Sequence, residues 1–212
     1  MKRLLLILVS ALFAAGATAQ VVETPVKGKT GIRLYDKSVR RTEIILPQIK
    51  GYNSYKADFH IHTIYSDGDV TPRQRVHEAW YDGLDILAIT DHYKYHPGGQ
   101  YGAMRLISGA EYHILGPNAP GGVFETFHVV ALDADRDPAV SAEMIDGPAP
   151  VHQRTREVVE TIHAAGGAAI LAHPAWSLNT PEQILAIHRE TPFDMTEIYN
   201  STSDMPRNCR PY

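Results

Sequence analysis

Histidines follow short apolar segments in this chain, and this pattern constrains its fold most strongly. A continuous apolar run at residues 85–90 is followed by Asp91 and His92, and another at residues 168–172 is followed by His173. Unbroken apolar runs of this length are typical of parallel strands that are buried on both faces. Strands that alternate with helices and carry polar residues at their carboxyl ends are typical of a βα barrel. The sequence therefore predicts an α/β protein with a polar site at one end of its strands.

Residues 58–68 (DFHIHTIYSDG) contain the densest group of metal-ligand residue types. We interpret their first part as the end of a strand that starts at Tyr55. Side chains alternate along a strand, so His60 and His62 would point the same way. Asp67 adds an oxygen ligand, and the glycine after it permits a turn back toward the two imidazoles. Because histidine is the commonest metal ligand, we favour a metal site over a polar loop.

A carboxylate is predicted to join these histidines. Residues 105–110 lead into Glu111, and a turn rich in glycine and proline separates them from a strand-like run at residues 123–132 that contains His128. A hairpin would bring His128 beside Glu111. His113 would lie on the same strand face as Glu111, and the spacing leaves open which of the two is the ligand. A buried carboxylate among histidines is reasonable if it bridges two cations, because an unpaired buried charge is costly.

Three helices and a last strand are predicted from start signals and periodicity. Threonine followed by proline is typical of an N-cap and first helical turn, and it predicts helices at residues 71–83 and from residue 180 onward. Residues 152–165 form a third helical pattern, and residues 195–199 are predicted to be a strand. The acidic, proline-containing residues 133–150 are predicted to be a surface excursion.

The amino terminus has the pattern of a secretory signal. Residues 1–19 combine a charged start, an apolar stretch and the small residues of a cleavage site before Gln20. The apolar run is shorter than the roughly 20 residues that a spanning helix needs, so we expect no stable membrane anchor. We predict an exported protein, with the periplasm as its compartment. Residues 20–53 would form a polar lead-in with one or two edge strands, and residues 54–212 the main domain.

Composition excludes several other classes of protein. The formal net charge of −4 gives no support for binding to nucleic acid or to an anionic membrane surface. Cys209 is the only cysteine, which excludes an intramolecular disulfide bond. The sequence also has no Gly-x-Ser-x-Gly motif for a serine nucleophile. We therefore expect chemistry that needs no nucleophile from the protein.

Five segments resemble, in their order along the chain, the motifs of the PHP (polymerase and histidinol phosphatase) superfamily. They are residues 58–63 with 66–68, residues 89–92, residues 109–111, residues 127–130 and residues 171–174. The resemblance extends from Lys56 to about Ser203 and is nearer to the secreted phosphodiesterase-like branch than to histidinol phosphatase. It implies a distorted (β/α)7 barrel, related to the TIM barrel. It also implies that phosphomonoesters or phosphodiesters are hydrolysed by a metal-bound hydroxide, with no separate catalytic residue.

The resemblance also implies a ligand set for two or three divalent metal ions. His60 and His62 would hold one metal, Glu111 would bridge it to a second held by His128 and His173, and Asp67 and His92 would help to bind a third. Such histidine-rich sites suit Zn, Mn or Fe better than Mg or Ca. The implied partner is a small phosphorylated substrate, and the sequence gives no indication of an oligomeric state.

One departure from the superfamily pattern concerns the end of the chain. The final motif, Asp-x-His on the last strand, has no match before Tyr212. This predicts a barrel that is incomplete at its carboxyl end, with Asn200 or Asp204 as a candidate substitute ligand. Two other functions stay open, namely a metallohydrolase that acts on a bond other than a phosphoester and a catalytically inactive metal-binding fragment.

Overall fold

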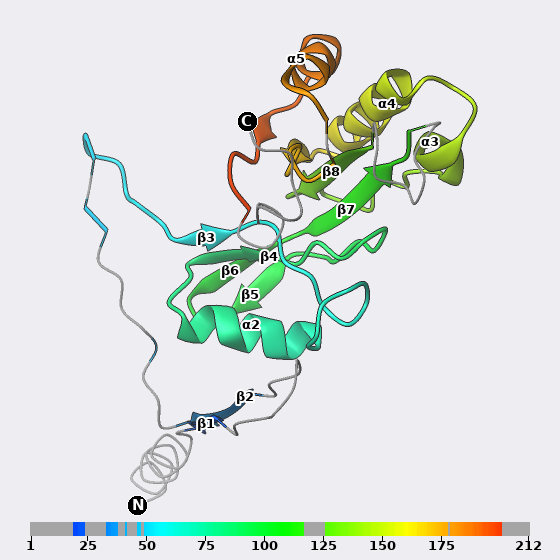
Figure 1. The fold of residues 1–212 in the computed structure, drawn as a ribbon. Helices are drawn as coiled ribbons and strands as arrows, with labels where there is room; N and C mark the ends of the chain where they lie inside the picture. The colour runs from blue at the N-terminus through cyan, green and yellow to red at the C-terminus, as the bar shows by residue number, and fades with distance from the viewer. Residues whose placement is uncertain are drawn as a thin grey trace, which may run out of the picture.

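The computed structural model describes most of the chain between residues 49 and 200 (Figure 1). The described residues are 19–23, 33–37, 41, 46–47, 49–116, 126–177 and 179–200. The predicted signal sequence, except its last residue, lies outside them, as do the candidate ligand Asp204 and most of the predicted turn before residue 126. None of the described helices is long and apolar enough to span a membrane.

The first of two four-stranded sheets follows the predicted strand–helix–strand pattern. Its strands lie in the order β3 (Ala57–Asp58), β4 (Ile86–Ala88), β6 (Met104–Ile107) and β5 (Gly99–Tyr101). Strands β3, β4 and β6 are parallel, whereas β5 is antiparallel to β6. Helix α2 (Pro72–Tyr81) connects β3 to β4 and begins after the N-cap Thr71, as predicted. It packs Val76 and Ala79 against the apolar side chains of this sheet.

The second sheet contains the predicted hairpin. Its strands lie in the order β10 (Met195–Thr196), β9 (Ala168–Ala172), β8 (Phe127–Leu132) and β7 (Gly109–Ile114). Strand β8 is antiparallel to both β7 and β9, and β9 and β10 are parallel. Helix α4 (Val151–Ala164) packs the fully buried Val158, Val159 and Ile162 against this sheet. Full burial of one such side chain contributes about 1.5–3 kcal/mol.

Apart from α2 and α4, four described elements lie outside the two four-stranded sheets. Strands β1 (Ala19–Glu23) and β2 (Arg33–Lys37) form a separate antiparallel pair, which begins at the last residue of the predicted signal sequence and is not an edge of either four-stranded sheet. Helix α5 (Pro181–Glu190) begins after Thr180, whose side chain accepts a hydrogen bond from the backbone N–H of Gln183. The sequence did not predict helix α3 (Ala142–Asp146), which is capped by Ser141 and lies in the stretch that was predicted as a surface excursion.

Two predicted strands are shorter than the sequence pattern indicates. Strand β3 ends at Asp58, and beyond it the backbone N–H of Thr90 donates to the carbonyl oxygen of Ile61 at 2.8 Å. Strand β10 ends at Thr196, and beyond it the N–H of Glu197 donates to the carbonyl oxygen of Leu171 at 2.9 Å. Beyond each strand, a backbone hydrogen bond therefore keeps the chain beside the neighbouring strand, β4 for the first segment and β9 for the second.

The two four-stranded sheets pack against each other, but the described strands do not close into a ring. Ala88 from β4 packs in one apolar cluster with Val130 from β8 and Ile170 from β9. Strands β3 and β10 each lie at the end of their own sheet. Figure 1 shows α2 beside the first sheet and α3, α4 and α5 beside the second. The structure is therefore a mixed α/β fold, and the predicted seven-stranded barrel is not confirmed.

The chain crosses from the first sheet to the second at Ser108, which alone separates β6 from β7. A Cβ atom at Gly109 would lie 2.6 Å from the carbonyl oxygen of Ile89, at the end of β4. Glycine therefore permits a close approach between β7 and the end of β4. This approach lets the N–H of Glu111 donate to the carbonyl oxygen of Asp91 at 3.2 Å.

We expect Gly109→Ala to lower the free energy of unfolding by about 1–3 kcal/mol, because the added methyl group would push the end of β4 away from β7. Chemical denaturation followed by circular dichroism measures this change. Gly99→Ala is the matched control, since a Cβ atom at Gly99 would meet no atom within 4 Å. Equal stability of the two variants would show that the close approach at Gly109 is not needed.

Candidate metal centre

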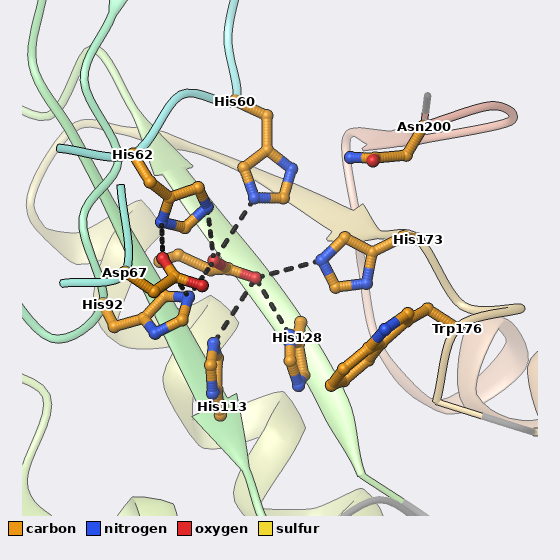
Figure 2. A pocket seen from close by; sticks show the side chains of 10 residues that line it. His60, His62, Asp67, His92, His113, His128, His173, Trp176 and Asn200 are labelled. Carbon is orange, nitrogen blue, oxygen red and sulfur yellow. Dashed lines mark hydrogen bonds and ion pairs between the residues drawn. The ribbon is translucent and has the colours of Figure 1, made fainter. Parts of the chain in front are cut away.

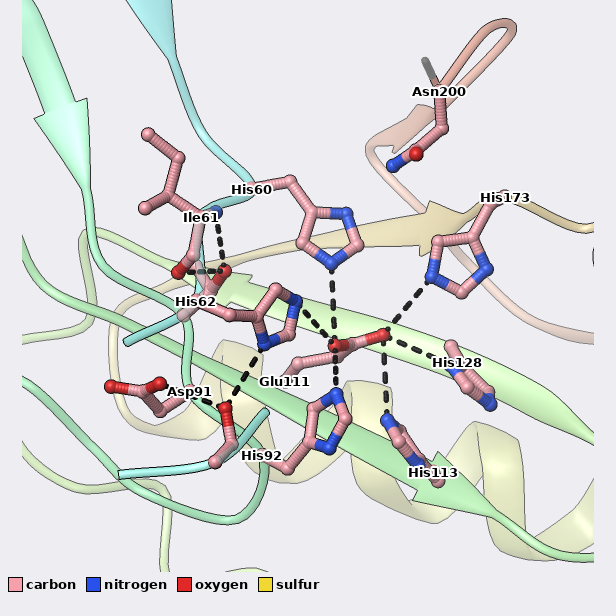
Figure 3. Close-up of polar contacts among 12 residues, drawn as sticks. His60, Ile61, His62, Asp91, His92, Glu111, His113, His128, His173 and Asn200 are labelled. Carbon is pink, nitrogen blue, oxygen red and sulfur yellow. Dashed lines mark hydrogen bonds and ion pairs between the residues drawn. The ribbon is translucent and has the colours of Figure 1, made fainter. Parts of the chain in front are cut away.

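Six imidazoles converge on one point (Figure 2), and the carboxylate of Glu111 lies at their centre (Figure 3). It is 0% exposed. Its Oε2 atom faces three Nε2 atoms, at 3.2 Å from His60, 3.2 Å from His62 and 3.1 Å from His92. Its Oε1 atom faces the Nδ1 atom of His128 at 2.9 Å and the Nε2 atoms of His173 at 3.2 Å and His113 at 3.6 Å. The two oxygens of one side chain thus face two different groups of nitrogen atoms.

Strand pairing explains why these side chains converge. In the antiparallel pair of β7 and β8, His113 lies directly opposite His128, and Glu111 lies two residues from His113 on the same face. The predicted hairpin contact between His128 and Glu111 is therefore confirmed. His113, which the spacing left as an alternative to Glu111, lies in the site together with it. His173 follows β9, the neighbour of β8, and so reaches the same end of the sheet.

The first sheet supplies the remaining residues of the site. The backbone N–H of Gly68 donates to the carbonyl oxygen of Thr63 at 2.9 Å, which closes the predicted tight turn. The turn places Asp67 Oδ1 3.2 Å from His62 Nδ1 and 3.8 Å from His92 Nε2. The side chain of Asp67 is 67% exposed, in contrast to the buried Glu111. Asp67 therefore lies at the solvent-facing side of the site.

Three groups of side chains in the described part of the chain have the spacing needed to hold a cation. They are His60 with Glu111 and His173, His62 with Asp67 and His92, and His92 with Glu111 and His113. Within each group the candidate ligand atoms lie within 4.8 Å of one another. His128 belongs to none of these groups, but all seven sequence-predicted ligands line one cavity together with His113.

Unsatisfied polar atoms indicate that the residues fit divalent cations. Glu111 Oε2 and His113 Nε2 are buried, and neither makes a well-aligned hydrogen bond to a described residue, although three imidazole nitrogens face Oε2 at 3.1–3.2 Å. Leaving such atoms without a partner costs about 1–3 kcal/mol each. Imidazole nitrogens with one shared carboxylate are a donor set that suits Zn, Mn or Fe. Cations at this position would satisfy both kinds of atom.

Electrostatics in the site are dominated by the buried carboxylate. Burial raises the pKa of Glu111, but hydrogen bonds from the surrounding imidazoles outweigh burial and hold the pKa well below its usual range. Burial lowers the pKa of His60, but the carboxylates of Glu111 and Glu197 raise it to about 10. Burial lowers the pKa of His128 to about 3. The metal-free site thus balances Glu111 with a proton on His60, and cation binding at His60 would release that proton.

Comparisons with known proteins identify the fold. One similar structure is a two-domain protein from Bacteroides vulgatus ATCC 8482 that contains a predicted PHP-like metal-dependent phosphoesterase, with a TM-score of 0.53 and 24% identity over 75% of this chain. The match covers 48% of that protein, so this chain spans about half of its length. Another is a protein from Bifidobacterium adolescentis ATCC 15703 that carries a provisional description as a metal-dependent phosphoesterase. Its TM-score is 0.51, with 18% identity over 74% of this chain and 81% of that one. The chain has a PHP-type fold. No protein-family model and no curated protein matches it.

Within this PHP-type fold, Glu197 is a residue of the site that sequence reasoning missed. Its Oε2 atom lies 3.3 Å from His60 Nδ1 and accepts a hydrogen bond from the backbone N–H of His173 at 2.8 Å. Glu197 directly follows β10, just as His173 directly follows β9. Because the sequence prediction extended this strand to residue 199, it placed Glu197 inside the strand, and the strand-end pattern did not mark it. Asn200, which sequence analysis named as a substitute ligand, lines the same cavity and donates to Glu197 Oε1 at 3.0 Å.

A second missed residue is Asp91, which is fully buried and holds the turn after His62. Its carboxylate accepts hydrogen bonds from the N–H and the hydroxyl of Thr63, both at 2.6 Å, and from the hydroxyl of Ser66 at 2.8 Å. The Ser66 oxygen also lies 3.1 Å from His62 Nδ1. His96 Nε2 lies 2.7 Å from the same carboxylate. Asp91 therefore orients His62 through Ser66 and does not face the cation groups itself.

We expect Asp91→Ala to lower the free energy of unfolding of the metal-free protein by about 3 kcal/mol, because it leaves several buried donors without an acceptor. Asp67→Ala removes the same charge from an exposed position of the same turn and serves as the control. Asp67→Ala is expected to change the free energy of unfolding by less than about 0.5 kcal/mol. Urea denaturation of both variants measures the difference. A similar loss in both would contradict the role given to Asp91.

Proposed function

We propose that this protein is a metal-dependent phosphoesterase that hydrolyses a small phosphomonoester or phosphodiester. The observation that carries the proposal is the position of Glu111, whose two carboxylate oxygens face separate groups of imidazoles. Such an arrangement suits two cations that share one carboxylate, and the group of His62, Asp67 and His92 suits a third. The similarity of the fold to PHP-like proteins supports the same reading. We propose a distorted, incomplete form of the (β/α)7 barrel as the scaffold.

The charge of the cavity around Glu111 also favours cations as the groups that neutralise a phosphate. Among the described residues, its lining includes eight side chains of histidine and acidic type, Trp176 and Asn200, but no lysine or arginine. Arg105 is 68% exposed and pairs with Asp133, and Lys94 lies over the ring of Tyr65, so neither lines this cavity. Negative charge on a phosphoryl group would therefore need bound cations.

Arg154 is buried away from this cavity. It is 2% exposed and donates to the carbonyl oxygens of Ala149 at 2.8 Å and of Met144 at 3.4 Å. It also donates to the carbonyl oxygens of Ile145 and Leu115. Arg154 therefore joins the end of β7 to α3 and α4, and it does not contact the site.

The protein's own side chains would hold and shape the reaction site. Eight side chains would hold the cations through nitrogen and oxygen atoms. They are His60, His62, Asp67, His92, Glu111, His113, His128 and His173. When bound, divalent cations of this kind lower the pKa of a water molecule and neutralise charge on phosphoryl oxygens. Trp176 packs beside the rings of His128 and His173 and limits water access on that side. The cavity volume of about 230 Å³ suits a small phosphorylated molecule.

The proposal extends to the cellular location through residues 1–19, whose pattern suggests export to the periplasm. Mass spectrometry of exported protein tests this part. A mature amino terminus at Gln20 is expected, and an intact Met1 would contradict it.

We expect the purified protein to bind two or three equivalents of Zn, Mn or Fe and to hydrolyse p-nitrophenyl phosphate or bis(p-nitrophenyl) phosphate only when loaded. Glu111→Gln removes the shared charge and should reduce both metal content and turnover. The loss of turnover should exceed about a hundredfold, because even outer-shell changes cost 10–100-fold. Elemental analysis and a chromogenic assay measure the two effects.

His163→Ala is the control for this experiment, because His163 Nε2 contacts Asp194 Oδ2 at 2.8 Å outside the site. It should retain both metal and turnover. Hydrolysis of amides or carboxylic esters without phosphoester turnover would favour the alternative metallohydrolase. Metal binding with no hydrolysis of any substrate would favour the inactive metal-binding protein.

A further inference from the structure

The carboxylate of Glu197 lies between two histidines that come from different sheets. Its Oε2 atom lies 3.3 Å from His60 Nδ1, on the segment that follows β3 of the first sheet. The same oxygen accepts a 2.8 Å hydrogen bond from the backbone N–H of His173, which follows β9 of the second sheet. The side chain of Glu197 is 18% exposed. One carboxylate oxygen therefore connects a candidate ligand of each sheet.

The contact with His60 fixes which ring nitrogen faces Glu111. His60 Nε2 lies 3.2 Å from Glu111 Oε2, while His60 Nδ1 faces Glu197. A carboxylate can only accept hydrogen bonds, so the Nδ1 atom of His60 carries a proton and donates a hydrogen bond to Glu197. The lone pair of the neutral ring then lies on Nε2, where a cation beside Glu111 would need it.

The contact with His173 supports an unusual backbone conformation. His173 has a φ angle of +22°, which is outside the regions that non-glycine residues prefer. The hydrogen bond from its N–H to Glu197 holds this conformation at the point where the side chain turns toward Glu111. Glu197 thus acts on the ring of one histidine and on the backbone of the other.

We propose that Glu197 is a positioning residue of the metal centre, which sets the ring tautomer and orientation of His60 and links it to His173. This inference rests on the proposed function only in that it needs a metal centre. Glu197 is not a ligand itself, because hydrogen bonds occupy both of its carboxylate oxygens. Its Oε1 atom accepts a hydrogen bond from the side chain of Asn200, and its Oε2 atom accepts hydrogen bonds from His60 Nδ1 and from the backbone N–H of His173. None of the three cation groups in the described residues includes it.

The chain offers a matched control for this carboxylate. Asp194 lies three residues earlier, where its Oδ2 atom accepts the backbone N–H of Ala169 at 2.8 Å and contacts His163 Nε2 at 2.8 Å. It thus makes the same two kinds of contact as Glu197, with a backbone N–H and with an imidazole, although its side chain is shorter and more exposed. The histidine that Asp194 contacts lies outside the candidate metal centre.

The first test measures Zn²⁺ affinity by competition with a chromophoric chelator and measures stoichiometry by elemental analysis. Glu197→Gln should weaken the tightest site about tenfold, as expected for loss of an outer-shell carboxylate, and retain the full stoichiometry at saturating Zn²⁺. Asp194→Asn should leave the affinity unchanged. Glu197→Asp keeps the charge but shortens the side chain, so its affinity should lie between those of the parent and Glu197→Gln. Thermal unfolding of the metal-free variants shows that each one is folded.

The second test is a double-mutant cycle with His60→Ala. If Glu197 acts through His60, Glu197→Gln should have little further effect once His60 is absent. An equal loss of affinity in both backgrounds would overturn the proposal. Loss of one equivalent of Zn²⁺ from Glu197→Gln would also overturn it, since Glu197 would then be a ligand.

The positioning role of Glu197 and the hydrolysis of a phosphoester can be refuted separately. Unchanged Zn²⁺ affinity in Glu197→Gln, with Zn²⁺ bound to the parent, would overturn the positioning role alone. A parent protein that binds Zn²⁺ as expected but hydrolyses no phosphoester would overturn the proposed function and leave the role of Glu197 supported by its own cycle. A parent that binds no Zn²⁺, Mn²⁺ or Fe²⁺ would overturn both.

Discussion

The fold depends on the compensation of one buried charge. The carboxylate of Glu111 is inaccessible to water, and an isolated buried charge costs several kcal/mol. Six imidazoles surround it, three from the first sheet and three from the second. Neither sheet could compensate the charge alone. Compensation of the Glu111 charge therefore requires both that the two sheets pack together and that the ends that face each other carry polar side chains.

The position of most site residues could be predicted from the sequence because of a simple geometric rule. A residue that follows an apolar run lies at the end of a strand, so His92 and His173 were expected at the polar end of the fold, although they follow strands of different sheets. The hairpin argument placed His128 beside Glu111 because a turn rich in glycine and proline between two strand-like runs favours antiparallel pairing. The ligand set as a whole came from the resemblance to the PHP motifs, because strand-end positions alone do not say how two sheets meet.

Other features could not be predicted because they depend on contacts between distant segments. Asp91 was interpreted only as the neighbour of His92, although its hydrogen bonds with Thr63 and Ser66 arise from the path of a turn 25–28 residues away in sequence. Glu197 was missed because residues 195–199 were considered only for their apolar content. The short helix α3 has little periodicity, and the prolines around it favoured an irregular segment.

The crossing at Ser108 has a consequence for how this protein can vary. Because side chains alternate along a strand, the insertion or deletion of one residue between β6 and β7 would exchange the two faces of β7. Tyr112, which packs with helix α4, would then point into the site, and Glu111 would point into the apolar layer under α4. Homologous proteins with this site should therefore keep the length of the junction constant, while the loops at the surface are free to change in length.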